Sequence, residues 1–181
     1  MMGTTTHQMT AEELIRLPDD GYRHELIKGE LLTMSPSGAE HGELVVNLTA
    51  PLATYVKQNC LGVIFGAETG FKLERDPDTV LAPDIAFVSR ERVSLIPANY
   101  LAIAPDLVVE VISPSEREQQ VKQKTQQWLS FGVRLVWLVK PKFRTVEIHR
   151  LNSAETLTVN EVLSGGEVVP GFEISVTSIF E

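Results

Sequence analysis

The stretch Leu107–Ser113 constrains this chain more than any other, because it is predicted to be a buried strand with one carboxylate inside it. Leucine, valine and isoleucine fill every position except Glu110 and the closing Ser113. A continuous β-branched run that is bounded by Pro105 and Pro114 is typical of a strand covered on both faces. An ionised carboxylate is costly there unless a cation or several hydrogen-bond donors meet it. The sequence must therefore supply Glu110 with a partner.

Two other places in the sequence can complete a site around Glu110. Asp84 lies near the start of an apolar strand that is predicted for residues 80–89. Lys124 lies on a helix that is predicted for residues 117–131, after Glu110 in the chain. Two carboxylates and a lysine on adjacent elements outline a divalent-metal phosphodiesterase site. The alternative is a structural ion pair between Glu110 and Lys124, with Asp84 as a cap at the start of its strand.

Simple geometry favours Lys124 over Lys122. The strand climbs about 10 Å from Glu110 to Ser113, at roughly 3.3 Å per residue. A helix that begins near Arg117 and folds back covers about the same 10 Å by Lys124, at roughly 1.5 Å per residue. Lys122 lies about 200° away from Lys124 around that helix and would point to solvent. We therefore expect Lys124 at the level of Glu110 and keep Lys122 as the second choice.

The chemistry of two neighbouring carboxylates favours a hard metal ion. Asp84 and Glu110 on adjacent strands would repel each other, and each would raise the pKa of the other. A divalent cation removes that penalty and becomes the largest local charge. The ligands are oxygens, without a cluster of histidines or cysteines, so we expect Mg²⁺ or Mn²⁺ rather than Zn²⁺.

Composition narrows the class of protein. The 181 residues predict one domain, 1–181, that is large enough for a proper core. The net charge of −8 argues against a protein that grips nucleic acid through a basic surface. It is compatible with an enzyme that touches nucleic acid locally, because acidic metal ligands lower the charge. Without a leader-like start or an apolar run of about 18 residues, we expect a cytoplasmic protein that has no membrane span.

Local patterns predict the other elements. Thr10 and Glu13 form a capping box for a short helix, and residues 23–34 alternate as a hairpin does. An apolar stripe at intervals of four predicts a long helix over 39–59. The order strand, helix, strand over 110–139 predicts a parallel or mixed sheet. Further strands are expected at residues 63–65, 69–73, 133–139, 145–150, 156–159 and 172–176.

Pro83-Asp84 followed by Glu110-Val111-Ile112 resembles the PD-(D/E)XK pattern of restriction-endonuclease-like nucleases. The lysine that usually stands two residues after the second acid is replaced by Ile112, and Lys124 fits a move of that lysine to the neighbouring helix. A wider set of motifs makes the chain similar to the Uma-type restriction endonuclease family, a bacterial family largely of unassigned function. The motifs are ELIKGEL from Glu25, SPS from Ser35, His41, PDIAFV from Pro83, EVISPS from Glu110, Lys124, Gly132-Val133 and Val136-Trp137-Leu138, and the resemblance covers residues 10–181.

The resemblance implies an α/β fold with a restriction-endonuclease-like core. In that fold a central mixed β-sheet is flanked by α-helices, here with an N-terminal helix and hairpin added. The metal ligands would be Asp84, Glu110 and the carbonyl of Val111. Lys124 would orient or activate the attacking water and stabilise the charge that develops on the phosphate.

Other residues would surround such a metal site. Glu25 would be an additional acid or outer ligand, and His41 would contact a phosphate or hold Glu25. Judged without the family, Glu25 is typical of an exposed hairpin position and His41 of a helix surface. Glu68, on the strand expected before Asp84, is a further candidate to reach the metal. The chain departs from the family at Gln120, where members often carry an acid.

These inferences give a leading hypothesis and an alternative. The leading hypothesis is a Mg²⁺- or Mn²⁺-dependent endonuclease that hydrolyses phosphodiester bonds of nucleic acid, with DNA as the expected substrate. The alternative is a catalytically inactive nuclease-fold module that binds a protein or nucleic-acid partner, which the acidic composition and Gln120 favour. Nucleases that cut duplexes often act in pairs, so a homodimer is also considered.

Overall fold

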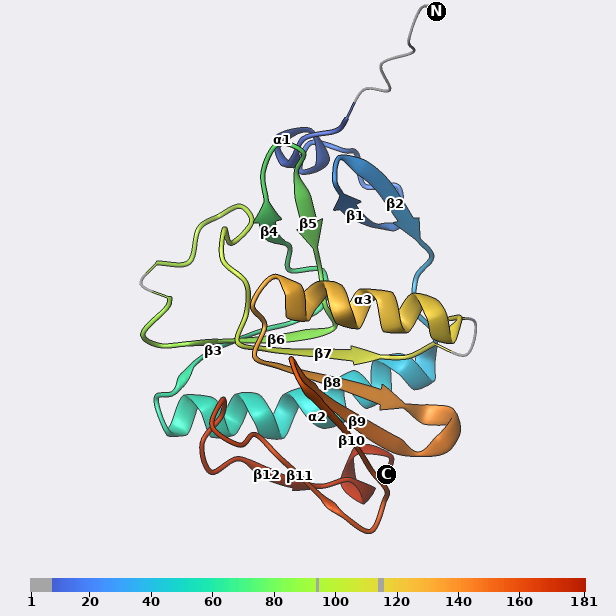
Figure 1. Ribbon diagram of the computed structural model, residues 1–181, viewed down its shortest axis with the longest axis vertical. Helices are drawn as coiled ribbons and strands as arrows, with labels where there is room; N and C mark the ends of the chain where they lie inside the picture. The colour runs from blue at the N-terminus through green and yellow to red at the C-terminus, as the bar shows by residue number, and fades with distance from the viewer. Residues whose placement is uncertain (1–7, 94, 114–115) are drawn as a thin grey trace, which may run out of the picture.

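The computed structural model describes residues 8–93, 95–113 and 116–181 (Figure 1). Its first element is the short helix α1 (Ala11–Leu14). The Thr10 hydroxyl accepts a hydrogen bond from the backbone N–H of Glu13, and the Glu13 carboxylate accepts one from the N–H of Thr10. The predicted capping box is therefore confirmed.

A four-stranded antiparallel sheet follows α1 and lies apart from the main sheet in Figure 1. Its strands stand in the order β2-β1-β5-β4. The predicted hairpin is confirmed as β1 (Arg23–Ile27) and β2 (Glu30–Met34), with Lys28 and Gly29 both at positive φ in the turn. The other two strands are β4 (Phe71–Glu74) and β5 (Thr79–Leu81).

The central sheet has six strands in the order β10-β9-β8-β7-β6-β3. All neighbours are antiparallel except β7 and β8, which run parallel and are joined through helix α3. The predicted mixed sheet around Glu110 is confirmed. The strands are β3 (Gly62–Phe65), β6 (Ile85–Ser89), β7 (Leu107–Val111), β8 (Leu135–Lys140), β9 (Thr145–Arg150) and β10 (Ser153–Leu157).

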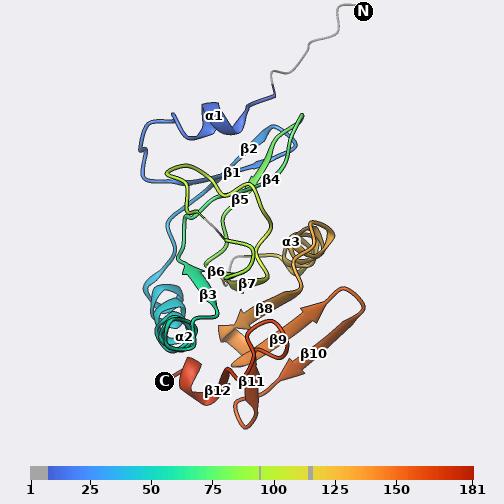
Figure 2. The same ribbon diagram turned by 90° about the vertical axis from the view of Figure 1, so that its left-hand side faces the viewer.

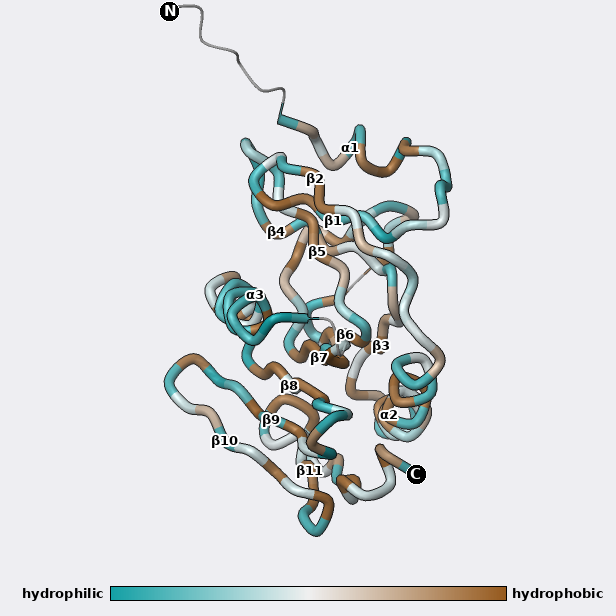
Figure 3. The backbone as a smooth tube through the Cα atoms, turned by 90° about the vertical axis from the view of Figure 1, so that its right-hand side faces the viewer, coloured by the Kyte–Doolittle hydropathy of each residue, from teal (hydrophilic) through white to brown (hydrophobic). Residues whose placement is uncertain are grey.

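Two helices sandwich this sheet, as Figure 2 shows. Helix α2 (Ala39–Gln58) covers one face and α3 (Glu118–Ser130) the other. The apolar stripe predicted for α2 is buried against the sheet at Leu44, Leu48, Leu52 and Val56. Figure 3 shows hydrophobic segments gathered in the central strands between the helices.

The C-terminal part of the chain packs on the α2 side of the sheet. It contains a small sheet of β11 (Val162–Ser164) and β12 (Glu173–Ser175), with short 3₁₀ helices at Pro141–Phe143 and Thr177–Ile179. Strand β11 was not predicted. Within the residues that the structure describes, no helix is long and apolar enough to cross a membrane.

The single strand predicted for residues 80–89 is wrong, because the chain changes sheets within it. Strand β5 ends at Leu81 and β6 begins at Ile85. Pro83 has no N–H to give to a ladder, and the N–H of Ala82 is bound by a side chain, so the intervening residues leave the strand. Asp84 therefore stands at the junction of the two sheets. The expectation that Glu68 lies on a strand is also wrong, because it lies in a turn after β3. Pro114, which was expected to bound β7, is outside the described residues.

Candidate active site

The direction in which the Glu110 side chain points follows from the alternation of β7. Successive strand side chains point to opposite faces of a sheet. Leu107, Val109 and Val111 belong to the core on the α2 side, whereas Val108 packs in the core under α3. Glu110 shares the parity of Val108, so its carboxylate faces α3. The residue is 8% exposed.

The partners of Glu110 are two residues one helical turn apart on α3. The Nζ of Lys124 lies 3.0 Å from Oε1 of Glu110, and Nε1 of Trp128 donates to the same oxygen at 2.9 Å. Lys122 is exposed. Of the two lysines considered, Lys124 is thus the one that reaches Glu110. Trp128 is fully buried and also serves as a hydrogen-bond donor.

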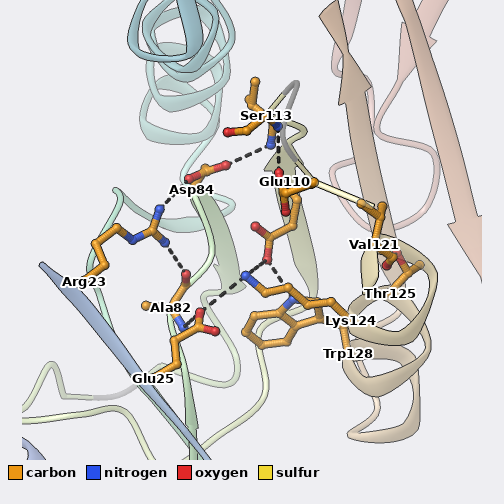
Figure 4. Close-up of polar contacts among 12 residues, drawn as sticks. Arg23, Glu25, Ala82, Asp84, Glu110, Ser113, Val121, Lys124, Thr125 and Trp128 are labelled. Atoms are coloured by element: carbon orange, nitrogen blue, oxygen red, sulfur yellow. Dashed lines mark hydrogen bonds and ion pairs between the residues drawn. The ribbon is translucent and has the colours of Figure 1, made fainter. Parts of the chain in front are cut away.

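Lys124 binds a second carboxylate, that of Glu25 on β1 (Figure 4). The distance from Nζ to Oε1 of Glu25 is 3.3 Å, and the same oxygen accepts the N–H of Ala82 at 2.9 Å. Glu25 is 3% exposed, so the interpretation of it as a solvent-facing hairpin residue is wrong. Lys124 links the hairpin sheet to the central sheet at this point.

Asp84 lies beside Glu110 at the adjacent strand. Strands β6 and β7 pair Ile85 with Val109, so the next position outward sets Asp84 opposite Glu110. The N–H of Val111 donates to Oδ2 of Asp84 at 2.8 Å. Since the N–H and C=O of one strand residue point to the same neighbouring strand, the carbonyl of Val111 also lies on the Asp84 side.

Two further donors bind the Asp84 carboxylate. Nη1 of Arg23 is 3.1 Å from Oδ1, and Nε2 of His41 is 3.1 Å from Oδ2. Arg23 also donates through Nη2 to the carbonyl of Ala82 at 2.7 Å. The expectation that His41 holds Glu25 is wrong, because α2 brings this histidine to Asp84. Sequence reasoning missed Arg23, although its place two residues before Glu25 on one strand sets both side chains on the same face.

The pKa shifts follow from burial and from these contacts. Burial raises the pKa of Glu110 to about 7, with help from the charges of Asp84 and Glu25 and against the attraction of Lys124. Burial also raises the pKa of Asp84, but the hydrogen bonds from His41 and the Val111 N–H and the charge of Arg23 outweigh it, and the pKa is lowered.

The two titratable donors shift in the opposite direction from the one that burial favours. The hydrogen bond to Asp84 raises the pKa of His41 above its ordinary value. Burial lowers the pKa of Lys124, but the charges of Glu110 and Glu25 are stronger and raise it. Lys124 therefore stays protonated at neutral pH, and its ammonium is a permanent hydrogen-bond donor in the site.

The donor set suits Mg²⁺ or Mn²⁺. Across the described residues, no group of three or more histidine, cysteine, aspartate and glutamate side chains is placed to hold a metal. Mg²⁺ needs only one or two carboxylates, because it keeps several waters. In the part of the chain that the structure describes, the contacts of Glu110 all go to Oε1, which leaves Oε2 for a ligand. Glu25, Asp84 and Glu110 are already paired with Lys124, Arg23 and His41, so a metal ion at this site has to compete with these donors.

The remaining residues considered from sequence lie outside this constellation. Gln120 is exposed and caps α3, where its side-chain oxygen accepts the N–H of Arg117 at 3.3 Å. Glu68 is exposed and borders a cavity of about 460 Å³ that Asp84, Arg23 and His41 also line. Neither contacts Asp84 or Glu110, within the residues described.

The chain is similar to one protein family and to a solved structure. A family model named Uma2, described as "Putative restriction endonuclease", matches residues 11–177. A solved structure from Anabaena variabilis ATCC 29413, described as a "putative nuclease belonging to DUF820", is 21% identical with a TM-score of 0.79 over 95% of this chain and 97% of that one. At this identity the likeness shows the fold, and it confirms the predicted restriction-endonuclease-like core. No curated protein matches.

Proposed function

The chain belongs to the Uma2 family of restriction-endonuclease-like proteins, and from that premise we propose that it is a metal-dependent endonuclease acting on DNA. The observation that carries the proposal is the convergence of Asp84, Glu110 and Lys124 at the junction of the two sheets. Two carboxylates side by side with an ammonium 3.0 Å from one of them match the needs of phosphodiester hydrolysis.

Asp84, Glu110 and the carbonyl of Val111 would hold the Mg²⁺ or Mn²⁺ ion. When bound, the ion polarises a phosphate oxygen and lowers the pKa of a water molecule. The protein contributes rigid placement of its ligands. The N–H of Val111 fixes the Asp84 carboxylate, and Trp128 with Lys124 fixes Oε1 of Glu110, so that the other oxygen of Glu110 has one orientation.

Lys124 would orient the attacking water and stabilise the charge that develops on the phosphate. Its raised pKa makes it a donor rather than a base, because the ammonium keeps its proton at neutral pH. Glu25 would act through Lys124, since it binds the same ammonium as Glu110 does. His41 would contact a phosphate from the cavity that it shares with Asp84.

Mn²⁺ titration by calorimetry tests the metal site without any assumption about the substrate. We expect one saturable site in the wild-type protein and its loss in Asp84→Asn and in Glu110→Gln. Each substitution keeps the shape of the side chain and removes its charge. Wild-type binding that both variants retain would refute the assignment of these carboxylates as ligands.

A second candidate function is a nuclease-fold module that binds nucleic acid or protein without cutting. The observation that favours it is the internal neutralisation of the carboxylates, with Arg23 and His41 on Asp84 and Lys124 on Glu110. Such pairs can be purely structural. DNA binding that is equal with Mn²⁺ and with EDTA, and that leaves the DNA intact, would favour this module.

We also propose that residues 1–181 form a single domain and that two copies act together on a DNA duplex. Enzymes that cut both strands commonly use one site for each strand. Light scattering at micromolar concentration tests the pairing, because a mass near 20.1 kDa would show a monomer. Limited proteolysis tests the single domain, which predicts no stable fragment shorter than the matched residues 11–177.

A further inference from the structure

Arg23 holds the carboxylate that the proposed metal would use. Nη1 of its guanidinium lies 3.1 Å from Oδ1 of Asp84, and Nη2 lies 2.7 Å from the carbonyl of Ala82. His41 and the N–H of Val111 bind the other oxygen of Asp84. Both oxygens of the carboxylate are therefore in use before any metal arrives, and a cation that approaches Oδ1 must compete with Arg23.

Competition of this kind weakens the first ligand. A guanidinium and a divalent ion on one carboxylate repel each other, most strongly where water is scarce. Asp84 is only 2% exposed, so water screens the two charges poorly. Metal binding should therefore loosen the contact between Arg23 and Asp84 and free part of the guanidinium.

The freed guanidinium has a place to act. Arg23, Asp84 and His41 line the same cavity of about 460 Å³, which opens beside the candidate metal site. Nε of Arg23 is buried and, among the residues that the structure describes, has no hydrogen-bond partner. A planar guanidinium with unused N–H groups matches the oxygens of a phosphate.

The acidic lining of the cavity makes phosphate binding depend on the metal. Asp19 and Glu68, both exposed, border the same cavity and repel a free anion. While Arg23 is held by Asp84, its charge is already matched. Once a divalent ion takes the carboxylate, the balance of charge at the cavity becomes favourable for a phosphate.

We propose that Arg23 is a phosphodiester-binding residue that Asp84 holds until a divalent metal takes this carboxylate. The inference rests on the proposed function and adds to it a coupling between metal and nucleic acid. Coupling between two ligands is reciprocal, so bound nucleic acid should also tighten the metal. A purely structural arginine would stabilise the fold without affecting either ligand.

Mn²⁺ calorimetry of Arg23→Gln tests the first half of the proposal. We expect the variant to bind Mn²⁺ about tenfold more tightly than the wild type, within the usual range of coupling between sites. Arg16→Gln, at an exposed arginine outside the site, is the matched control and should leave the affinity unchanged. Unchanged or weaker Mn²⁺ binding by Arg23→Gln would overturn the proposal.

Binding of a phosphorothioate DNA duplex, which resists hydrolysis, tests the second half. By fluorescence anisotropy, we expect Mn²⁺ to tighten DNA binding at least tenfold in the wild type and in Arg16→Gln, a change that reflects coupling of the ordinary size. In Arg23→Gln the gain should fall to less than threefold. An equal gain in all three proteins would overturn the role of Arg23 in phosphate binding.

A second variant separates these effects from loss of fold. Arg23→Lys keeps the charge but cannot bind Asp84 and the carbonyl of Ala82 together, so it should retain part of the coupling. Circular dichroism selects the variants that are folded. If the wild type binds Mn²⁺ through Asp84 while neither Arg23 variant differs from it, the inference fails and the metal site stands. If the wild type binds no Mn²⁺ even with DNA present, the metal-dependent function fails, and the inference with it.

Discussion

The ammonium of Lys124 lies 3.0 Å from Oε1 of Glu110, across the gap between helix α3 and strand β7. The two residues are 14 positions apart in the chain, yet the strand rises and the helix returns by nearly the same length. This contact supplies the cationic partner that the buried carboxylate of Glu110 needs. It also fixes the ammonium at the junction of the two sheets, where Asp84 and Glu25 stand.

Removal of the Lys124 ammonium should destabilise the protein and slow the proposed cleavage. Lys124→Met leaves Glu110 and Glu25 buried without their cation, which we expect to cost about 3 kcal/mol of unfolding free energy. Loss of a positioned donor at the reacting phosphate should lower the cleavage rate by about two to three orders of magnitude. Urea denaturation and a cleavage assay measure the two effects. Lys122→Met, at an exposed position on the same helix, should change stability by less than about 0.5 kcal/mol.

Mn²⁺ affinity should rise with pH through the titration of Glu110. The metal needs the ionised carboxylate, and burial raises the pKa of Glu110 to about 7. At pH 6 about one tenth of the carboxyl is ionised, so we expect affinity about tenfold weaker than at pH 8. Calorimetry at several pH values measures the slope. His41→Asn removes the titrating imidazole that binds Asp84, and this variant should keep the pH dependence of Mn²⁺ affinity that is due to Glu110. A Mn²⁺ affinity that does not change with pH in this variant would contradict the assignment to Glu110.

The same shift should make the metal-free protein less stable as pH rises from about 4.5 to 7. The pKa of Glu110 in the folded state lies above the ordinary value of 4.5, so the folded protein binds more protons than the unfolded chain in this interval. The stability contributed by the protonated carboxyl is complete below pH 4.5 and is lost as the pH passes through 7. Urea denaturation of the wild type and of Glu110→Gln at pH 5 and pH 8 isolates this contribution. A difference between the two proteins that stays constant with pH would refute it.

Trp128→Phe should weaken the placement of Glu110 through the loss of one hydrogen bond. The substitution keeps an aromatic ring but removes the N–H that donates to Oε1 of Glu110 at 2.9 Å. We expect the loss of the hydrogen bond to lower the free energy of unfolding by about 1 kcal/mol. Because this bond lowers the pKa of Glu110, its loss should also raise the pH at which Mn²⁺ binds. Trp137→Phe is the matched control, because Nε1 of Trp137 is buried without a partner within the described residues. An equal pH shift in both variants would exclude a specific role for Trp128.

Gln120→Glu, which introduces the acid that the family resemblance leads one to expect, should leave the metal site unchanged. Gln120 is exposed at the first turn of α3, where its side chain caps the helix. A glutamate there keeps the cap and interacts well with the helix dipole, so we expect about 0.5 kcal/mol of added stability. Mn²⁺ affinity should stay within about twofold. Much tighter binding would show that position 120 belongs to the metal site.

The sequence predicts those parts of the site that depend on local periodicity. The parity of β7 and the matched lengths of strand and helix are enough to place Lys124 near Glu110. Helix α2 and the hairpin are equally regular, and their bounds agree with the pattern to within about a turn.

The contacts that sequence reasoning missed depend on tertiary placement. The break between β5 and β6 lies within the largely apolar residues 80–89, where Pro83 is the one local signal for it. His41 meets Asp84 because α2 crosses beneath β6, which no local pattern encodes. In the sequence Arg23 is an ordinary residue of a predicted hairpin. Only the packing of the hairpin sheet near Asp84 brings its guanidinium to that carboxylate.

Cleavage of plasmid DNA in the presence of Mn²⁺ tests whether the protein is a metal-dependent nuclease. Supercoiled plasmid would be incubated with the wild-type protein, with Asp84→Asn, and with the wild type in EDTA, and the products would be separated by electrophoresis. We expect nicked or linear DNA only where the wild-type protein and Mn²⁺ are both present. Cleavage of equal rate by Asp84→Asn, or intact plasmid with all three although Mn²⁺ and DNA both bind, would contradict it.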